Sequence, residues 1–296
     1  MAATGSRDGF RLAATAKLNL YLHVTGVRAD GYHLLDTLIV FVRLHDELAF
    51  APNDTLSLVL RGPFAAALGE VALDDNLVLK AARHLARVHG VKQGAAIALT
   101  KNLPVAAGIG GGSADAAATL LGLARLWGLD LDVKTLGELG LALGADVPVC
   151  IEGKPSFVAG IGEQLAPATG LPPAGLVLVN PGVALSTASV FKAHGGKTSA
   201  SVSGETLPSD AAGLARYLKA RRNDLTEAAL SLAPVIGDVL SAIAATPDCL
   251  LARMSGSGAT CFGLYDGLPA AETAAATLQK DHSDWWIAAT ELLPGS

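Results

Sequence analysis

A cluster of glycines in the middle of the chain is the feature best suited to bind a charged group. Gly108, Gly110, Gly111 and Gly112 fall within five residues and run directly into Ser113, which opens the stretch SADAAATLLGLARLW. The serine can cap a helix, and the alanines and leucines after it favour one. Backbone N–H groups and a positive partial charge face out of a helix N-terminus, and glycines leave no Cβ in a phosphate's way. We therefore predict a phosphate-binding loop, the alternative being a flexible loop before an ordinary helix.

Two polar residues near the N-terminus have a spacing that places them on one side of a strand. From Leu12 to Val24 apolar and polar residues alternate, which is typical of a half-buried strand. Lys17 and Asn19 would then point the same way, roughly 7 Å apart. The pattern alone favours a solvated polar face. The functional alternative is that Lys17 supplies positive charge to a phosphoryl group during transfer.

One acidic residue lies between the end of a predicted helix and a proline. The helix expected over 133–143 ends at Gly144, and Ala145-Asp146-Val147-Pro148 follows. Asp146 is therefore predicted in a loop, as a turn residue or as a functional carboxylate. Phosphoryl transfer needs a phosphate cradle, a cation and a carboxylate near the acceptor hydroxyl. The chain offers one candidate for each, but sequence spacing does not show that they meet.

The elements that must position these residues follow from periodicity and turn signals. The early strands suggest an antiparallel meander, Asp74-Asp75-Asn76 begins a helix that ends near Gly90, and a Gly-, Ser- and Thr-rich mobile loop is expected over 192–210. A hairpin is expected over 150–160, with Glu152-Gly153 as its turn. The other expected strands cover 34–42, 55–61, 95–100, 176–179, 261–265 and 285–290, and the later helices cover 211–219, 224–232, 236–244 and 270–279.

The composition describes a globular chain. Of 296 residues, 51% are apolar and 17% charged, with a net charge of −5, which argues against a binder of nucleic acid or anionic membrane. Cys150, Cys249 and Cys261 are widely spaced, so we expect buried thiols in a reducing compartment. No secretory signal is visible at the N-terminus, and prolines interrupt the uncharged stretch 164–191, which favours a soluble, cytoplasmic protein. The proline-rich stretch after Leu165 is the best domain boundary, giving domains 1–163 and 164–296.

Two common types of phosphate loop do not fit this sequence. A P-loop would have a lysine after the glycines, and a dinucleotide fingerprint would be followed by a second strand ending in an acidic residue; neither occurs here. The pattern P-x-x-x-G-[LI]-G-x-x-S-A, from Pro104 to Ala114, resembles the ATP loop of the GHMP kinases. The resemblance also takes in AKLNLYLHVTGVRADGYHLLDTL (16–38), GADVP and MSGSGATCF, so it covers the chain end to end.

This resemblance implies an α/β, two-domain GHMP kinase fold. The N-terminal domain would be similar to ribosomal protein S5, the C-terminal domain would be the α/β GHMP domain, and the active site would lie in the cleft between them. The segment Arg28–His33 resembles one member in particular, which phosphorylates a cytidyl diphosphate sugar alcohol in the non-mevalonate route to isoprenoid precursors. The chain departs from the family pattern at Ala106-Ala107, where many relatives carry further glycines.

The resemblance also implies roles for individual residues. Asp146 would be the catalytic base, and Lys17 would hold Asp146 and the hydroxyl in place. The ATP phosphates would be wrapped by Pro104, Gly108, Ile109, Gly110, Gly111, Gly112 and Ser113, with Mg²⁺ carried by the nucleotide and no protein ligand to the metal. The substrate would be lined by Asn19, Tyr32, His33 and Phe191, the last three near the cytosine. The expected partners are ATP and this small substrate, with no nucleic acid or membrane, in a monomer or weak homodimer.

Two other functions stay open. One is another GHMP kinase, acting on mevalonate derivatives, homoserine or a sugar; the Tyr32-His33 pair counts against it, because such substrates carry no pyrimidine. The other is a non-catalytic RNA-binding module, suggested by the S5-like half. The sequence pI of about 5.8 and the presence of both Lys17 and Asp146 count against that alternative.

Overall fold

A computed structural model describes residues 9–69, 75–202 and 204–295. The chain divides into two compact units. Unit 1 takes the described residues of Met1–Ala16, Leu44–Val105 and Gly110–Gly153, and unit 2 takes those of Lys17–Arg43, Ala106–Ile109 and Lys154–Ser296. The division therefore differs from the single boundary at 163/164 that the sequence suggests. The reason is that strands β1 (Phe10–Val27) and β2 (His33–Asn53) each contribute residues to both units.

In unit 1 the strands form a mixed sheet. The end of β2 pairs antiparallel with β4 (Gly94–Thr100), from Glu47↔Thr100 to Asn53↔Gly94. Strand β3 (Leu56–Arg61) pairs with the other edge of β4 and runs parallel to it. The predicted antiparallel meander is therefore wrong in this part, because β4 lies between β2 and β3 and the chain crosses over through helices to reach it.

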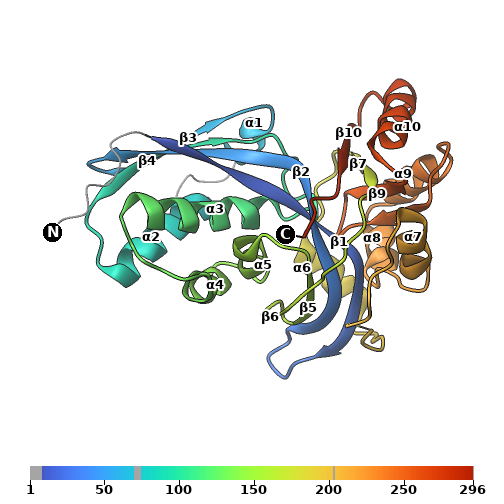
Figure 1. Cartoon of the computed structure of the whole chain (residues 1–296), viewed down its shortest axis with the longest axis horizontal. Coiled ribbons are helices and arrows are strands. Elements are labelled where there is room, and N and C mark those ends of the chain that lie inside the picture. The colour runs from blue at the N-terminus through green and yellow to red at the C-terminus, as the bar shows by residue number, and fades with distance from the viewer. Residues whose placement is uncertain (1–8, 70–74, 203, 296) are drawn as a thin grey trace. The chain divides into compact units, whose positions relative to one another are not determined.

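Helices α2 to α5 of unit 1 lie on one face of these strands (Figure 1). Helix α2 begins after Asn76, whose side chain accepts a hydrogen bond from the backbone N–H of Val78, and it ends at Gly90 in the left-handed conformation, as predicted; Asp74 lies outside the described residues. Helices α2, α3, α4 and α5 pack on one another around an apolar core. The helices are α1 (Ala65–Gly69), α2 (Leu77–His89), α3 (Gly111–Leu126), α4 (Val133–Leu141) and α5 (Val147–Glu152).

Unit 2 contains two antiparallel arrangements. The first part of β2 pairs with β5 (Ser156–Gly160), and β5 pairs with β6 (Gln164–Pro167). The predicted hairpin over 150–160 is therefore displaced: its turn lies between Gly160 and Gln164, because residues up to Glu152 form helix α5. A separate sheet has the order β10-β7-β9-β8, with strands β7 (Gly175–Asn180), β8 (Leu251–Met254), β9 (Cys261–Tyr265) and β10 (Trp286–Glu291).

The helices of unit 2 pack against this second sheet and against one another. Helix α10 contacts β7, β9 and β10, and α9 contacts β8 and β9, which encloses an apolar core of its own. The four helices predicted from residue 211 onward are confirmed to within a few residues. They are α7 (Ala211–Lys219), α8 (Thr226–Leu232), α9 (Val235–Ala244) and α10 (Leu268–Asp281), and α6 (Thr187–His194) precedes them.

Candidate active site

The polar residues of β1 are buried. The predicted alternation is present, but from Ala16 to Val24 both faces of the strand are covered, and Lys17 and Asn19 are only 4% and 3% exposed. The solvated face that the pattern favours is therefore wrong here. Burying an ammonium and an amide is unfavourable unless they are hydrogen-bonded, so their partners determine what this segment can do.

Lys17 and Asn19 point the same way, as predicted, and form a pair in unit 2. The Lys17 Nζ donates to Asn19 Oδ1 at 2.7 Å, and Asn19 Nδ2 donates to Thr37 Oγ1 on β2 at 2.9 Å. The Thr37 hydroxyl in turn donates to the backbone carbonyl of Tyr21. This chain of bonds fixes the orientation of the Asn19 amide and holds the Lys17 ammonium beside it.

The start of the glycine loop is bound to this same strand. The Lys17 backbone N–H donates to Ile109 O at 3.0 Å. The Ser255 hydroxyl accepts from the Asn19 N–H at 3.1 Å and donates to Gly108 O at 3.1 Å. One serine hydroxyl thus joins β1, the glycine loop and the Gly/Ser turn at 254–260. The family resemblance includes this segment, as MSGSGATCF, but no role in the site was predicted for Ser255.

Gly108 is required by close approach as well as by backbone conformation. It has φ +73°, and a Cβ built on it would lie 2.5 Å from Gly258 O and 2.7 Å from Ser255 O. Two residues earlier, Ala106 adopts φ +53°, a left-handed conformation that is uncommon for alanine. The departure from the family pattern at Ala106 therefore leaves the turn in place, at the cost of some backbone strain.

The predicted cytosine-binding residues also lie in unit 2. The rings of His33 and Phe191, from β2 and α6, have centroids 4.7 Å apart at 36°. Tyr32, just before β2, is 60% exposed. Burial lowers the pKa of His33, and nearby His194 lowers it further, so His33 is neutral at pH 7. His33 and Phe191 therefore form a tilted pair of rings, in which the neutral imidazole also offers hydrogen-bonding nitrogens.

The remaining phosphate-loop residues belong to unit 1 and form the first turn of α3. Gly110 is the residue before the helix, at φ +68°, and the first i→i−4 bond runs from Ala114 N to Gly110 O at 2.8 Å. The predicted Ser113 cap is therefore wrong: the residue before the helix is Gly110, three residues earlier, because Gly110 can adopt the left-handed turn. The N–H groups of Gly111, Gly112 and Ser113 come before the helical ladder, which makes them available to an anion. Gly112 is exposed, and Pro104 is buried where the chain enters the loop.

Asp146 lies in unit 1 at the N-terminus of α5. It is the residue before the helix, with Pro148 in the first turn, and its carbonyl accepts from Cys150 N at 3.2 Å. The loop predicted around Asp146 is therefore the start of a short helix. Asp146 is partly buried, and its side chain makes no capping hydrogen bond to α5.

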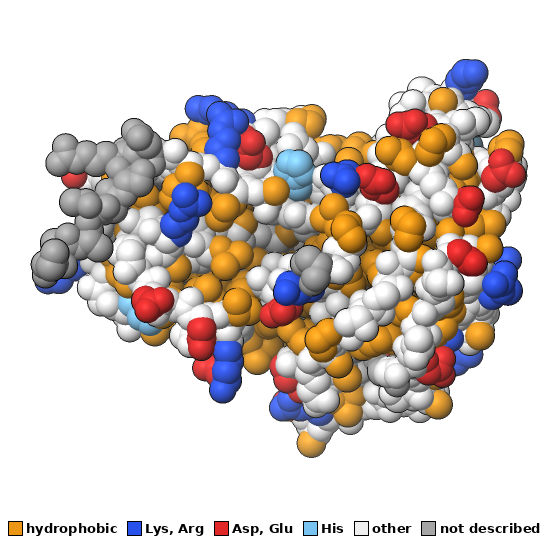
Figure 2. All heavy atoms as spheres, viewed as in Figure 1, with side chains coloured by type: hydrophobic (Ala, Val, Ile, Leu, Met, Phe, Trp, Pro, Cys, Tyr) orange, Lys and Arg blue, Asp and Glu red, His pale blue; other side chains and the backbone are white. Residues whose placement is uncertain are grey.

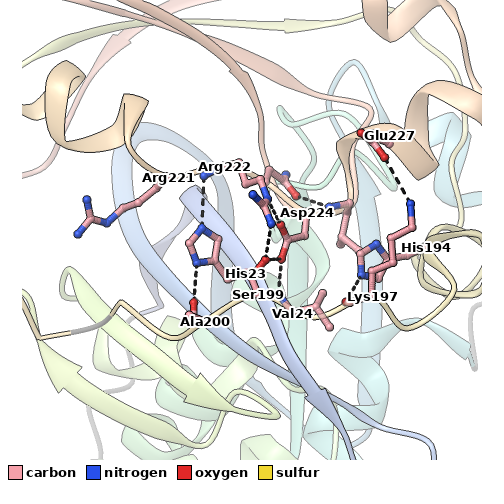
Figure 3. Close-up of polar contacts among 12 residues, drawn as sticks. His23, Val24, His194, Lys197, Ser199, Ala200, Arg221, Arg222, Asp224 and Glu227 are labelled. Carbon is pink, nitrogen blue, oxygen red and sulfur yellow. Dashed lines mark hydrogen bonds and ion pairs between the residues drawn. The ribbon is translucent and has the colours of Figure 1, made fainter.

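The far end of β1 is held by a second network in unit 2 (Figure 3). Asp224 accepts hydrogen bonds from the Val24 N–H, the Ser199 hydroxyl and Arg222 Nε at 2.6–2.9 Å. Burial raises the pKa of Asp224, but these bonds outweigh it and hold that pKa below its usual value. The segment predicted as a mobile loop is therefore fixed to β1 around Ser199.

His23 belongs to the same network. One ring nitrogen, Nδ1, faces the carbonyl of Ala200 at 3.2 Å, and the other, Nε2, faces the N–H of Arg222 at 3.3 Å (Figure 3). A carbonyl can only accept and an N–H can only donate, so these partners select the neutral tautomer with its proton on Nδ1.

A cavity of about 450 Å³ adjoins His23 and is also lined by Thr198, Ser199, Lys219, Arg221 and Arg222. Arg221 is paired with Glu205 at 2.5 Å and Arg222 with Asp224, so most of the positive charge in its wall is balanced within unit 2.

Charges elsewhere on the surface are mixed. Figure 2 shows a face on which Lys and Arg side chains are interspersed with Asp and Glu, as the net charge of −5 leads one to expect. Among the described residues, no group of three or more His, Cys, Asp and Glu side chains is arranged to hold a metal ion. No helix in this part of the chain is both long and apolar enough to cross a membrane.

Comparison with known proteins places these features in a family. The model of the GHMP kinase N-terminal domain matches residues 76–154, and that of the GHMP kinase C-terminal domain matches residues 199–284. A protein of Paramagnetospirillum magneticum named 4-diphosphocytidyl-2-C-methyl-D-erythritol kinase is 58% identical over 96% of this chain and 99% of its own length. A protein of the same name from Rhodospirillum rubrum is 53% identical over 95% of this chain and 92% of its own.

Solved structures agree with this placement. A crystal structure of 4-(cytidine 5′-diphospho)-2C-methyl-D-erythritol kinase superimposes with a TM-score of 0.76 and 33% identity, covering 97% of this chain and 100% of that one. Homoserine kinase from Cytophaga hutchinsonii has a TM-score of 0.75 over 100% and 98% of the two chains, but at 18% identity it shows a shared fold alone. The predicted α/β GHMP kinase fold is confirmed, and the chain belongs to the GHMP kinase family, in the branch of the 4-diphosphocytidyl-2-C-methyl-D-erythritol kinases.

Proposed function

We propose that this protein transfers the γ-phosphoryl group of ATP to the 2-hydroxyl of 4-diphosphocytidyl-2-C-methyl-D-erythritol, a step of the non-mevalonate route to isoprenoid precursors. The choice of this substrate rests on one observation: over nearly the whole chain, the protein is 58% identical to a relative whose name contains that substrate. The rings of His33 and Phe191 support the same substrate, because aromatic faces can stack on a cytosine ring.

The phosphate loop supplies the binding of ATP in this proposal. The first turn of α3 offers N–H groups of Gly111, Gly112 and Ser113, and the absence of side chains at the two glycines lets a triphosphate approach the backbone. This arrangement fits a nucleotide. When bound, ATP supplies the phosphoryl group, and a Mg²⁺ ion carried with it would neutralise part of the phosphate charge.

Asp146 is proposed as the base for the acceptor hydroxyl. As the hydroxyl oxygen forms a bond to the γ-phosphorus, the bond from that phosphorus to the β,γ-bridging oxygen breaks and ADP leaves. The hydroxyl proton passes to the Asp146 carboxylate. Lys17, held by Asn19 at 2.7 Å, is proposed to stabilise the negative charge of the base and of the transferring group, and Asn19 to bind the substrate.

The substrate pocket is proposed to be formed by Tyr32, His33 and Phe191. A neutral His33 has one donor and one acceptor for the edge of cytosine, and the aromatic rings provide stacking surfaces. We propose that the enzyme acts in the cytoplasm as a monomer or weak homodimer.

The test is ATP consumption by the purified full chain with Mg²⁺ and one acceptor at a time. The acceptors are 4-diphosphocytidyl-2-C-methyl-D-erythritol, mevalonate, homoserine and galactose, and mass spectrometry identifies the product. We expect turnover on the cytidyl compound alone. Turnover on another acceptor would refute the substrate and the roles of Tyr32 and His33. ATP binding without turnover on any acceptor would refute the kinase activity and favour a binding function.

A further inference from the structure

A buried group of three charges lies behind the phosphate loop in unit 1. Asp46 is on β2, Lys101 directly follows β4, and Asp115 is in the second turn of α3. Their exposures are 0%, 2% and 3%. The Lys101 ammonium bridges the two carboxylates, at 2.5 Å from Asp46 Oδ2 and 2.8 Å from Asp115 Oδ2. We name this group the Asp46–Lys101–Asp115 cluster.

The cluster is bonded to the backbone that enters the loop. The second carboxylate oxygen of Asp46 accepts from the N–H groups of Asn102 at 2.6 Å and Leu103 at 2.9 Å, just before Pro104. The Lys101 backbone N–H donates to Arg61 O at 2.7 Å. The direction in which the chain leaves β4 is therefore set by one buried carboxylate.

The cluster also contacts the beginning of α3. The Lys101 Nζ lies 3.0 Å from the position that a Cβ on Gly111 would occupy. Through Asp115 the same ammonium is bonded to the helix one turn further on. One side chain thus connects the entry of the loop, its first helical residue and the body of the helix that presents the N–H groups.

The stability of the fold does not by itself explain a cluster of buried charges. Buried ion pairs cost much of their attraction in lost solvation, and apolar side chains of similar volume often serve stability as well or better. Ionic groups at this place provide something that apolar groups cannot, namely directed bonds to the backbone before the loop and to a side chain of the helix after it.

We propose that Asp46, Lys101 and Asp115 are positioning residues that hold the phosphate loop in its ATP-binding geometry. This rests on the proposed function only in that ATP is the ligand. None of the three touches substrate in the proposal; they act through the backbone of Asn102–Leu103 and the first turn of α3.

The charge of the cluster supports this role and predicts a pH dependence of ATP binding. Burial raises the pKa of Asp115 to about 7, although Lys101 lowers it, and Asp115 Oδ1 is buried without a hydrogen-bond partner among the described residues. Burial lowers the pKa of Lys101, but the two carboxylates outweigh it, so Lys101 stays charged. The charged groups that act on Asp115 are Lys101 and Asp46; α2, α4 and α5, which pack on α3, add none in the described chain. The cluster is therefore neutral below pH 7 and carries one negative charge above it, where it opposes phosphate binding.

The experiment measures the Kd of ATP with Mg²⁺ by calorimetry on the full chain, at a temperature where circular dichroism shows each variant folded. Lys101→Met is expected to raise the Kd about tenfold or more, since small displacements of a binding loop have large effects. The matched control is Lys80→Met, which removes an exposed lysine paired with Asp75 in the same unit and should leave the Kd unchanged. Asp46→Asn, which keeps an oxygen for the two N–H groups, should raise the Kd less than Asp46→Leu.

Asp115→Asn keeps the Asp46–Lys101 pair and provides a second test if Lys101→Met does not fold. In the unmodified protein the Kd of ATP should rise between pH 6 and pH 8, and in Asp115→Asn that rise should be lost or strongly reduced. The proposal would be overturned if every folded variant had the same Kd as Lys80→Met and the same pH profile as the parent. The cluster would then have a merely structural role. Because acceptor turnover is not measured, failure here is distinct from failure of the proposed reaction.

Discussion

Gly108 offers a test of how the phosphate loop is built. In Gly108→Ala the new Cβ would meet two backbone carbonyl oxygens of the 255–258 turn, at 2.5 and 2.7 Å, distances that real Cβ atoms essentially never show. These oxygens belong to backbone, so they cannot move away as the end of a flexible side chain could. The substitution therefore displaces either the loop or the turn.

The loss of folding stability in Gly108→Ala has two parts, backbone strain and overpacking, and a control variant separates them. Gly128 also has a positive φ, +66°, but nothing lies within 4 Å of its Cβ position. An alanine in the left-handed conformation lowers the free energy of unfolding by about 1–2 kcal/mol. About 0.4–1 kcal/mol of this is recovered because alanine makes the unfolded chain stiffer, so Gly128→Ala should lose about 1 kcal/mol of stability. Gly108→Ala carries the same strain plus about 1–3 kcal/mol of overpacking, so it should lose about 2–4 kcal/mol.

The measurement is urea unfolding followed by circular dichroism, together with the Kd of ATP. We expect Gly108→Ala to unfold at clearly lower urea than Gly128→Ala, with an unchanged slope, and to bind ATP about tenfold or more weakly. Gly128→Ala should bind ATP as the parent does. If the two variants have equal stability and equal ATP affinity, the close approach of Gly108 to the 255–258 turn is not what requires a glycine.

Three further predictions concern the site and its supports. Asp146→Asn should lose most of kcat while the Kd of ATP changes little; near-normal turnover in steady-state assays would exclude Asp146 as the base. Tyr32→Ala should mainly raise the KM for the cytidyl substrate, and an unchanged KM would remove Tyr32 from the pocket. Asp224 has a folded-state pKa below its ordinary value of 3.8, so its stabilisation is present above about pH 4 and is lost as pH falls through the folded pKa. The stability gap between the parent and Asp224→Asn, from urea unfolding at several pH values, should therefore narrow below about pH 4; a constant gap would contradict this.

The sequence was sufficient to predict features that depend on local pattern. The glycine loop, the helix after it and the alternation of β1 are properties of neighbouring residues, and the structure contains them. Local pattern did not determine burial, however. The pattern favoured a solvated face for Lys17 and Asn19, because nothing near them in the sequence reveals that Asn19 binds Thr37 and Ser255.

Features that depend on distant pairing could not be predicted. Asp46 and Lys101 are 55 residues apart, and no local motif singles out either of them. The position of β4 between β2 and β3 is a matter of sheet order, which strand pattern does not contain. At the start of α3, a serine and a glycine were both suitable caps, and the left-handed turn at Gly110 decided between them.

The Ser255 hydroxyl has a consequence for the order in which the protein can be completed during synthesis. Its partners, the Gly108 carbonyl and the Asn19 N–H, precede it by 147 and 236 residues. At about 5–20 residues per second, roughly 7–30 s separate the synthesis of the glycine loop from that of the serine that fixes it. During that interval the nascent chain holds the complete loop sequence without the serine hydroxyl that bonds to it. We therefore expect the loop to reach its final geometry late in synthesis, only after Ser255 has been added to the chain.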